Sequence, residues 1–289
     1  METVWSEHIQ GTMTLYTSRR LRFHDRFREQ YTALFGLADG PMRILEIGCG
    51  PGALAEALQR WYPKAEITGL DRDVGFLEFA RERVPGVAFL KGDATALPFA
   101  ESSFDVVISN TVQEHVEPSA FFGEQLRVLR PGGVCLVLSS RRGLHVTAPC
   151  LEWDEAERSF WEKVSRMDDT DARYGVCRYP MNEAELPAAM EKYGFRRVSV
   201  GYAAADQTPD DPRVPPELGM EMIDSGRYND LEALELTVRS FGDRLDADEA
   251  ALVRRRIEDK YYRRKEQYRR GEKQWETTVS LIMAVRGEK

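Results

Sequence analysis

The sequence predicts an α/β protein built on a largely parallel sheet. Two observations carry this prediction. Short apolar runs alternate with amphipathic segments between about residues 43 and 140, and the first apolar run ends in a glycine-rich turn. Strands that alternate with helices at this spacing form βαβ units, whose sheet is covered by helices on both faces.

Each predicted strand is a short apolar run bounded by polar or glycine residues. The predicted strands are 42–48, 66–71, 87–93, 104–110 and 134–140. Predicted helices occupy 53–62, 74–84 and 119–130. In the first of these helices, Leu54, Leu58 and Trp61 share one face at the spacing i, i+4, i+7. This stretch is the regular part of the chain.

The alternation stops after Ser140, and residues 141–179 show no clear strand. It resumes with a predicted helix at 182–195 and a strand at 196–203, and a last strand is expected at 278–285. Residues 206–219 contain four prolines and are expected to form a loop. The highly charged segment from about Asn229 to Trp275 is predicted to be helical.

The N-terminal segment 14–37 is also predicted to be a helix. Its apolar residues Phe23, Phe27, Tyr31 and Leu34 recur at i, i+4, i+8 and i+11. This spacing forms one stripe, and we expect that stripe to pack on the sheet.

Length and composition exclude several classes of protein. The chain has 289 residues and a formal net charge of -8, and 42% of its residues are hydrophobic. It is long enough for one large domain, has no apolar stretch of membrane-helix length, and lacks a signal-peptide pattern at its start. Its four cysteines are scattered and its four histidines never pair at ligand spacing, so we expect no disulfide framework and no metal site. A cytoplasmic protein that binds neither membrane nor nucleic acid is expected.

The glycine-rich turn ILEIGCGPG occupies residues 44–52 and suggests a nucleotide ligand. Gly48 and Gly50 allow a bulky ligand to approach the backbone. Alone, the motif also fits the G-x-G-x-x-A pattern of a nicotinamide site, with Ala53 as the last residue. Asp71 follows Gly50 by 21 residues, and its carboxylate suits the ribose hydroxyls of any adenosine ligand.

Three further features distinguish between the two ligands. Glu46 precedes the first glycine by two residues, where it would repel a pyrophosphate but suit a positively charged amino-acid end. Asp93, at the end of the third predicted strand, is placed to accept a hydrogen bond from an adenine amino group. The run FDVVISNTVQEHV (104–116) is then followed by LRVLRPGG (126–133), which supplies a strand, a helix and a turn in fixed order.

Together these motifs resemble the class I S-adenosylmethionine-dependent methyltransferases, a match that covers residues 42–140 and continues plausibly at 182–203 and 277–286. The resemblance implies a Rossmann-like, doubly wound, seven-stranded and mostly parallel sheet with an antiparallel last strand, plus helical cap insertions. It also implies S-adenosyl-L-methionine as cofactor.

The resemblance carries cofactor-binding roles over to matching positions. Glu46, Gly48 and Gly50 would surround the methionine end, although Glu46 could instead cap a nearby turn. Asp71 would bind the ribose, and Asp93 and Ala94 the adenine. Asn110 and Thr111 would lie near the sulfonium, and Arg72 would cover the adenine face. By the same resemblance, Tyr16 or Arg20 from an N-terminal lid would meet the methionine carboxylate, unless both belong to a solvated surface.

His115 follows the fourth strand and is the one catalytic candidate, as a general base. The alternative is a hydrogen-bonding residue at a helix start, since E-H-V also looks like a generic pattern of the family. The sequence SNTV departs from the (N/D)PP(Y/F) motif of relatives that modify bases or glutamine, so transfer to those acceptors is disfavoured.

The basic run 254–273 has ten Lys and Arg against four Asp and Glu. It suggests RNA or membrane binding, but Val253, Ile257 and Tyr261 fall on one helical face, which favours a solvated amphipathic helix. This helix could pair with the acidic segment 151–171, which has eight acids and three bases.

The sequence therefore predicts a methyltransferase that acts on an oxygen, nitrogen or carbon of a small molecule. A non-catalytic S-adenosylmethionine-binding sensor or partner subunit and an RNA methyltransferase are the alternatives. One domain is expected over 1–289, with a core of 24–140, 180–205 and 275–289. The cap would comprise 1–23, 141–179 and 206–274. The oligomeric state and the acceptor are not predicted.

Overall fold

A computed structural model describes residues 5–167 and 173–289. They form a seven-stranded sheet in the order β3-β2-β1-β4-β5-β7-β6, in which β7 runs antiparallel to its neighbours β5 and β6. The strands are β1 Met42–Ile47, β2 Ala65–Asp71, β3 Ala88–Lys91, β4 Phe104–Asn110, β5 Leu129–Val146, β6 Arg196–Gln207 and β7 Thr277–Glu288. The Rossmann-like architecture with an antiparallel last strand is thereby confirmed.

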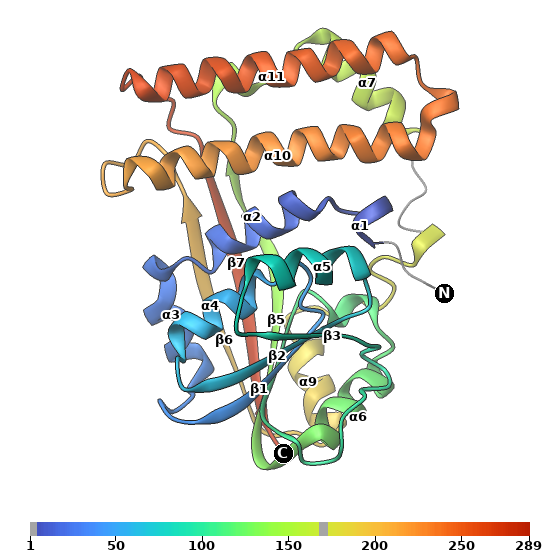
Figure 1. The fold of residues 1–289 in the computed structure, drawn as a ribbon, viewed down its shortest axis with the longest axis vertical. Coiled ribbons are helices and arrows are strands. Elements are labelled where there is room, and N and C mark those ends of the chain that lie inside the picture. Colours follow the sequence, from blue (N-terminus) through green and yellow to red (C-terminus); the bar gives the residue numbers. More distant parts are fainter. Residues whose placement is uncertain (1–4, 168–172) are drawn as a thin grey trace.

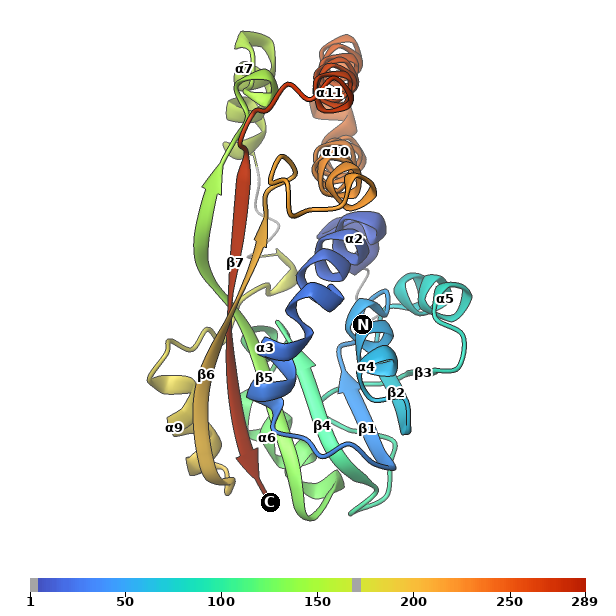
Figure 2. The same ribbon diagram turned by 90° about the vertical axis from the view of Figure 1, so that its left-hand side faces the viewer.

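Helices cover both faces of this sheet (Figures 1 and 2). The described helices are α1 Trp5–His8, α2 Thr12–Arg22, α3 Arg28–Phe35, α4 Ala53–Trp61, α5 Val74–Arg83, α6 Pro118–Val128, α7 Glu155–Ser165, α9 Glu185–Lys192, α10 Pro216–Phe241 and α11 Ala247–Arg269. Short 3-10 turns are η1 Asp25–Phe27, η2 Gln113–His115, η3 Pro149–Leu151 and η4 Gly242–Arg244. Helices α3, α4 and α5 lie on one face, and α6 and α9 on the other.

Each face has its own apolar core. Tyr31 and Phe35 of α3, with Leu58 of α4, pack against one side of the central strands. Phe122 of α6 and Met190 of α9 pack against the other side. The stripe predicted in the N-terminal segment is thus confirmed as a sheet-packing face, because Phe23, Phe27 and Tyr31 all belong to the first core.

The prediction that β5 ends at Ser140, with no strand in 141–179, is wrong. β5 continues to Val146 because β7 extends alongside it, with Leu144 opposite Val279 and Val146 opposite Thr277. A register shift between Arg141 and Leu144 interrupts this pairing. The two long strands rise above the rest of the sheet toward α7 and α11 (Figure 2).

Two predicted helical stretches are divided. The 14–37 helix is interrupted at His24, whose side chain accepts a hydrogen bond from the Arg26 N–H (3.2 Å) and caps a new turn. The stretch 229–275 contains two helices, of which α10 begins at Pro216, inside the predicted loop. Asp246 caps the second by accepting hydrogen bonds from the N–H groups of Asp248 and Glu249.

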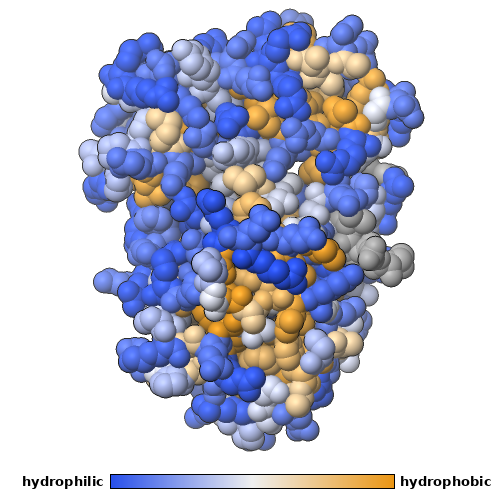
Figure 3. Space-filling view, in the orientation of Figure 1, coloured by the Kyte–Doolittle hydropathy of each residue, from blue (hydrophilic) through white to orange (hydrophobic). Residues whose placement is uncertain are grey.

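A helical cap lies above the sheet, where α7, α10 and α11 share an apolar core that includes Phe160, Ile223, Leu234 and Ile257. Its outer surface is mostly hydrophilic, and apolar side chains show between α10 and α11 (Figure 3). Below it, α2 packs against α10. The N-terminal segment, the segment after β5 and the segment before β7 therefore meet at one end of the molecule (Figure 1).

The expected pairing between the basic run and the acidic segment is confirmed at two places. Arg256 lies 3.1 Å from Asp154, and Lys260 donates to Glu157 at 2.8 Å with both side chains 3% exposed. The predicted helical segment does not reach Trp275, since α11 ends at Arg269 and the indole is 55% exposed.

The buried Arg264 connects three segments of the chain. Its guanidinium is fully buried and donates to Asp210 (2.7 Å) and Glu276 (2.8 Å). Asp210 also accepts hydrogen bonds from the backbone N–H groups of Gln274 and Trp275.

Within the described ranges, no helix combines the length and apolarity needed to cross a lipid bilayer.

Arg264→Ala is expected to lower the free energy of unfolding by about 3–5 kcal/mol, because it leaves two carboxylates without their cationic partner. Urea denaturation followed by circular dichroism measures the loss. Arg269→Ala, which removes an exposed arginine of the same helix, is the control and should change stability by about 0.5 kcal/mol or less. Equal small losses in both variants would contradict a structural role for Arg264.

Candidate active site

The carboxyl ends of β1, β2 and β4 meet at one edge of the sheet. Ile47 of β1 lies opposite Leu70 of β2 and Ser109 of β4, so the residues that follow these strands converge. In open α/β sheets, ligands bind outside this edge. A cavity of about 1170 Å³ opens there, and Glu46, Gly48, Gly50, Asp71, Arg72, Asp93, Ala94, Asn110, Thr111 and His115 all line it.

The glycine turn has the conformation that its sequence requires. Gly48, Gly50 and Gly52 have φ values of +66°, +52° and +87°, which glycine adopts without strain. A Cβ atom on Gly48 would lie 2.3 Å from the Val112 side chain. The turn therefore brings bare backbone to the cavity immediately before α4.

Asp71 is bound to this turn. Its Oδ2 accepts the Gly50 N–H (2.8 Å), and its Oδ1 accepts the Asp73 N–H (2.9 Å). Burial raises its pKa, while these backbone donors lower it. Because each carboxylate oxygen can accept a further hydrogen bond, Asp71 is held in place and can still bind hydroxyl groups.

Glu46 and Asn110 present unpartnered oxygens to the cavity. Glu46 is 2% exposed, and its Oε2 has no hydrogen-bond partner in the described structure; the same holds for Asn110 Oδ1. Burial, and then the charge of Asp71, raises the pKa of Glu46 well above its usual range. Buried polar atoms are nearly always satisfied, so these two acceptors suit a ligand that carries a cationic donor.

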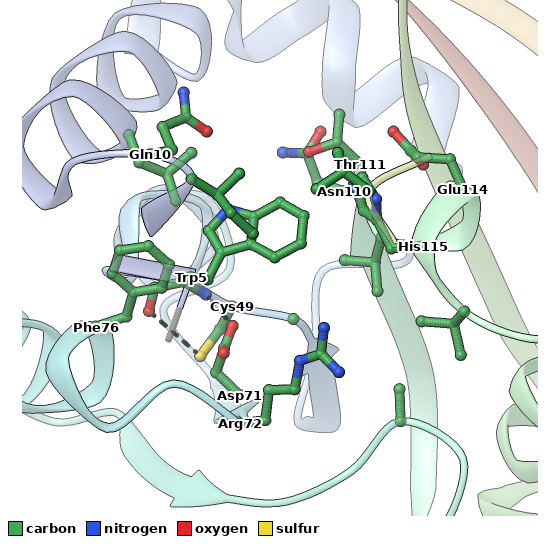
Figure 4. Close-up of a pocket in the computed structure, with 18 of the residues that line it drawn as sticks. Trp5, Gln10, Cys49, Asp71, Arg72, Phe76, Asn110, Thr111, Glu114 and His115 are labelled. Atoms are coloured by element: carbon green, nitrogen blue, oxygen red, sulfur yellow. Dashed lines mark hydrogen bonds between the residues drawn. The ribbon is translucent and has the colours of Figure 1, made fainter. Parts of the chain in front are cut away.

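Asp93, Ala94 and Arg72 line the cavity beyond the ends of β2 and β3. Asp93 Oδ1 accepts hydrogen bonds from the Thr95 N–H (2.8 Å) and hydroxyl (2.7 Å), which hold its pKa below the usual range despite burial. The Arg72 side chain points into the cavity, toward the side where His115 lies (Figure 4).

The prediction that Tyr16 or Arg20 faces the ligand needs correction. Tyr16 is buried beside Phe79 and donates to Glu56 (2.9 Å), while Arg20 pairs with Glu221. Neither lines the cavity. The neighbouring Arg19 does, because it lies one helical turn after Leu15, which packs over Gly50.

Arg19 is a partly buried cation that forms no ion pair with a carboxylate among the described residues. Its Nη2 reaches Thr111 Oγ1 at 3.4 Å. Burial, and then the charge of Arg22, lowers its pKa well below the usual range. Thr111 itself has a φ of +54°, a conformation that is costly for a β-branched residue. An arginine and a strained threonine thus meet where β4 ends.

The N-terminal segment closes over the cavity as a lid, formed by α1 and α2. Asp73, at the start of α5, accepts hydrogen bonds from the Ser6 N–H and hydroxyl (both 2.8 Å). Glu232 of α10 accepts the N–H groups of Met13 (3.0 Å) and Thr14 (2.7 Å) at the start of α2. A Cβ on Gly11 would lie 2.0 Å from Glu232 Oε2, so a glycine permits this contact.

His115 is placed at the cavity, but its ring nitrogens are not free for proton abstraction. Its Nδ1 accepts the Cys177 N–H (2.9 Å), and its ring packs edge-on against Trp5 with centroids 4.7 Å apart. A neutral imidazole with Nδ1 as acceptor carries its proton on Nε2. Burial, and then the charge of Arg72, lowers the pKa of His115 to about 4. The geometry therefore favours the hydrogen-bonding alternative over the general base.

Part of the cavity wall was not predicted. It comes from Trp5 of α1 and the Ile9 that follows this helix, from Gly175, Val176 and Arg178, and from Asn229, Ala233 and Leu236 of α10. Only the α10 residues carry a sequence signal, because their spacing of i, i+4, i+7 marks one helical face. Glu114, between the cations Arg19 and Arg141, was also missed; its Oε2 is buried without a partner.

The fold and the cavity define a class of proteins that bind an adenosine-containing ligand at the carboxyl edge of a Rossmann-like sheet. Comparison with known proteins narrows that class. A family model described as a methyltransferase domain matches residues 45–137. A fatty-acid O-methyltransferase from Mycolicibacterium smegmatis is 39% identical over 118 residues, which cover 39% of this chain and 41% of that protein.

A phthiotriol/phenolphthiotriol dimycocerosates methyltransferase from Mycobacterium tuberculosis is 43% identical over 98 residues, 32% of this chain and 36% of its own length. These matches thus span about two fifths of the relatives or less. The structure of Haemonchus contortus phosphoethanolamine N-methyltransferase 2 with S-adenosyl-L-methionine shares the fold, with a TM-score of 0.51 and 19% identity over 99% of this chain and 60% of that one. Residues 45–137 of this chain are thus similar to a methyltransferase domain, and the chain shares its fold with a protein that binds S-adenosyl-L-methionine.

The hydrogen bond from Cys177 predicts the state of His115. We expect nitrogen-15 NMR to show a neutral ring protonated on Nε2, with no titration between pH 8 and 6, and the spectrum of His115→Gln assigns the signal. Because the folded pKa of about 4 lies below the ordinary value, the stability contributed by the neutral ring is complete above about pH 6.5 and is lost as pH falls toward 4. A titration midpoint near 7 would restore the general-base role.

Proposed function

We propose that this protein transfers a methyl group from S-adenosyl-L-methionine to an oxygen, nitrogen or carbon nucleophile of a small molecule. The observation that carries the proposal is the convergence, at one sheet edge, of Asp71 beside the glycine turn with the unpartnered acceptors Glu46 and Asn110. This donor set suits a ligand with ribose hydroxyls at one end and an ammonium group at the other. The match of residues 45–137 to a methyltransferase domain supports the same cofactor.

The residues present fit the cofactor along the length of the cavity. Asp71 would bind the ribose hydroxyls, and Asp93 with Ala94 the adenine. Glu46, Asn110 and the backbone of Gly48 and Gly50 would surround the methionine end. Arg72 would lie against the adenine. When bound, S-adenosylmethionine supplies a methyl group on a positively charged sulfur.

The lid residues would exclude water and orient the two reactants. Trp5, Leu15 and Arg19 project into the cavity from above, and orientation alone can lower a barrier by on the order of 7–11 kcal/mol. No base is required when the acceptor atom is already deprotonated. The hydrogen bond that His115 Nδ1 accepts from Cys177 is compatible with a reaction that needs no general base.

The acceptor would occupy the part of the cavity between α1, α10 and residues 174–179. The named activities of the mycobacterial relatives, on a fatty acid and on phthiotriol-type dimycocerosates, support a small-molecule acceptor. We propose that the chain is one domain in which the cap segments 1–23, 141–179 and 206–274 contribute this compartment, with the extended end of β5 as its support. A cytoplasmic location stays a prediction.

Calorimetric titration with S-adenosylhomocysteine tests the cofactor assignment. We expect binding by the wild type and a roughly 10- to 100-fold weaker affinity in Asp71→Ala, because a hydrogen bond to a charged acceptor contributes about 1.5–3 kcal/mol. Asp71→Asn retains an acceptor for the glycine turn and serves as the second variant. Asp39→Ala, an exposed acid far from the cavity, is the control. Absence of binding by the wild type would refute the proposal.

Arg19 replaces Tyr16 and Arg20 as the residue proposed to bind the methionine carboxylate. Arg19→Gln should weaken S-adenosylhomocysteine binding by about tenfold or more. Binding of 5′-deoxy-5′-methylthioadenosine, which lacks the amino-acid end, should change by less than about twofold. Arg20→Gln is the matched control and should leave both ligands unaffected. Equal losses for the two ligands in Arg19→Gln would indicate a general effect on the lid instead.

A further inference from the structure

The first helix of the lid, α1, is attached to the loop that carries Asp71. Asp73 Oδ2 accepts the Ser6 N–H and Asp73 Oδ1 accepts the Ser6 hydroxyl, both at 2.8 Å. The Asp73 N–H donates in turn to Asp71 Oδ1 at 2.9 Å. Asp73 is 3% exposed and also caps α5 by accepting the Phe76 N–H (3.2 Å). A residue of α1 is therefore bound to a firmly held residue two positions after Asp71.

The neighbouring Trp5 projects its side chain from α1 into the cavity. Its ring packs edge-on against His115, with centroids 4.7 Å apart. In Figure 4 the indole lies between Phe76 of α5 and His115 of η2, and Asp71 and Arg72 lie below it in this view. The contacts of Ser6 and of Trp5 thus place the indole over the part of the cavity that Asp71 and Arg72 enter.

This part of the cavity has acceptors for the edges of a nucleoside. Asp71 and Asp93 present carboxylates, which suit ribose hydroxyls and an adenine amino group. The flat faces of a purine require apolar or aromatic contacts instead, and the small apolar side chains of Cys49, Leu70 and Ala94 line the cavity nearby. These side chains offer no aromatic surface of the size of a purine.

Trp5 can supply that surface. Among the residues that the structure describes, it is the one tryptophan that lines the cavity. Its side chain is only partly buried, whereas Phe76, which also lines the cavity, is 2% exposed and belongs to the protein interior. Aromatic side chains that remain accessible next to hydrogen-bonding groups are the usual platforms on which nucleic-acid bases stack.

We propose that Trp5 is the residue that covers the nucleoside of the cofactor: its indole stacks on the adenosine moiety, and the two hydrogen bonds between Ser6 and Asp73 hold it there. This inference rests on the proposed function, because it adds a lid residue to the same cofactor site. The role differs from that of Arg19, since a stacked indole contacts the nucleoside and not the amino-acid end. Release of the ligand requires α1 to separate from Asp73.

Calorimetric titrations with S-adenosylhomocysteine, 5′-deoxy-5′-methylthioadenosine and adenosine test the stacking. Because the three ligands share the adenosine moiety, Trp5→Ala should weaken all of them by a similar factor of about tenfold. Trp5→Phe keeps an aromatic face and should restore most of the affinity, which distinguishes stacking from a loss of folding. Arg19→Gln should give a different pattern and weaken S-adenosylhomocysteine alone. Trp275→Ala, which removes an exposed tryptophan outside the cavity wall, is the matched control.

Intrinsic fluorescence provides a second measurement. The tryptophans of the chain are Trp5, Trp61, Trp153, Trp161 and Trp275. Since only the first of them lines the cavity in the described structure, adenosine should change the emission of the wild type and of Trp275→Phe. It should leave the emission of Trp5→Phe unchanged.

The attachment of α1 is tested through the rate of release. Ser6→Ala removes one of the two hydrogen bonds to Asp73 and should speed the dissociation of S-adenosylhomocysteine by about two- to tenfold. Its association rate should change little. Stopped-flow measurement of the Trp5 emission gives both rates, and Ser165→Ala, at an exposed serine of α7, is the control.

Four results would overturn the inference: equal affinities of Trp5→Ala and the wild type, a loss confined to S-adenosylhomocysteine, a loss that phenylalanine does not restore, or an emission change that persists in Trp5→Phe. Failure of the wild type to bind S-adenosylhomocysteine would instead refute the proposed function itself.

Discussion

The parallel register of β1 with β2 and β4 is the constraint on which the site depends. It sets Ile47 opposite Leu70 and Ser109, so Gly48, Asp71 and Asn110 each begin just beyond the same edge. The glycine turn then folds back onto Asp71 through one hydrogen bond from Gly50. A shift of one residue in either pairing would turn Glu46 or Asn110 to the opposite face of the sheet.

A second pairing, between the extended ends of β5 and β7, supports the helical cap above the sheet. These strands carry the chain from the sheet edge to α7 and from α11 back to the sheet. The cap that they support has its own apolar core and buried ion pairs, among them those of Lys260 and Arg264. Buried charges tolerate few alternative arrangements, so these pairs define how the cap helices sit against one another.

The lid joins the two halves. Glu232 lies on the same helix as the cavity-lining Asn229 and Leu236. Its carboxylate accepts hydrogen bonds from the first turn of α2, the helix on which Leu15 and Arg19 line the cavity. Asp73, at the start of α5, likewise accepts hydrogen bonds from Ser6 of α1. The N-terminal segment is therefore bound both by α10 and by the residue that begins α5.

The sequence by itself determined the α/β class, the five strands of the first half and the set of residues at their ends, because strand-end acids and glycines are local features with a regular spacing. It also indicated that 254–273 would pair with 151–171. Arg19 lines the cavity and Tyr16 and Arg20 do not, because the rotation of α2 about its axis relative to Gly50 depends on how the N-terminal segment packs. The Nδ1 atom of His115 accepts a hydrogen bond from the backbone N–H of Cys177, which is 62 residues away in the sequence. Contacts between residues so far apart in the sequence depend on tertiary packing. The extension of β5 along β7 and the cavity wall formed by α1, α10 and residues 174–179 depend on it too, because no local sequence pattern specifies which segment each of them packs against.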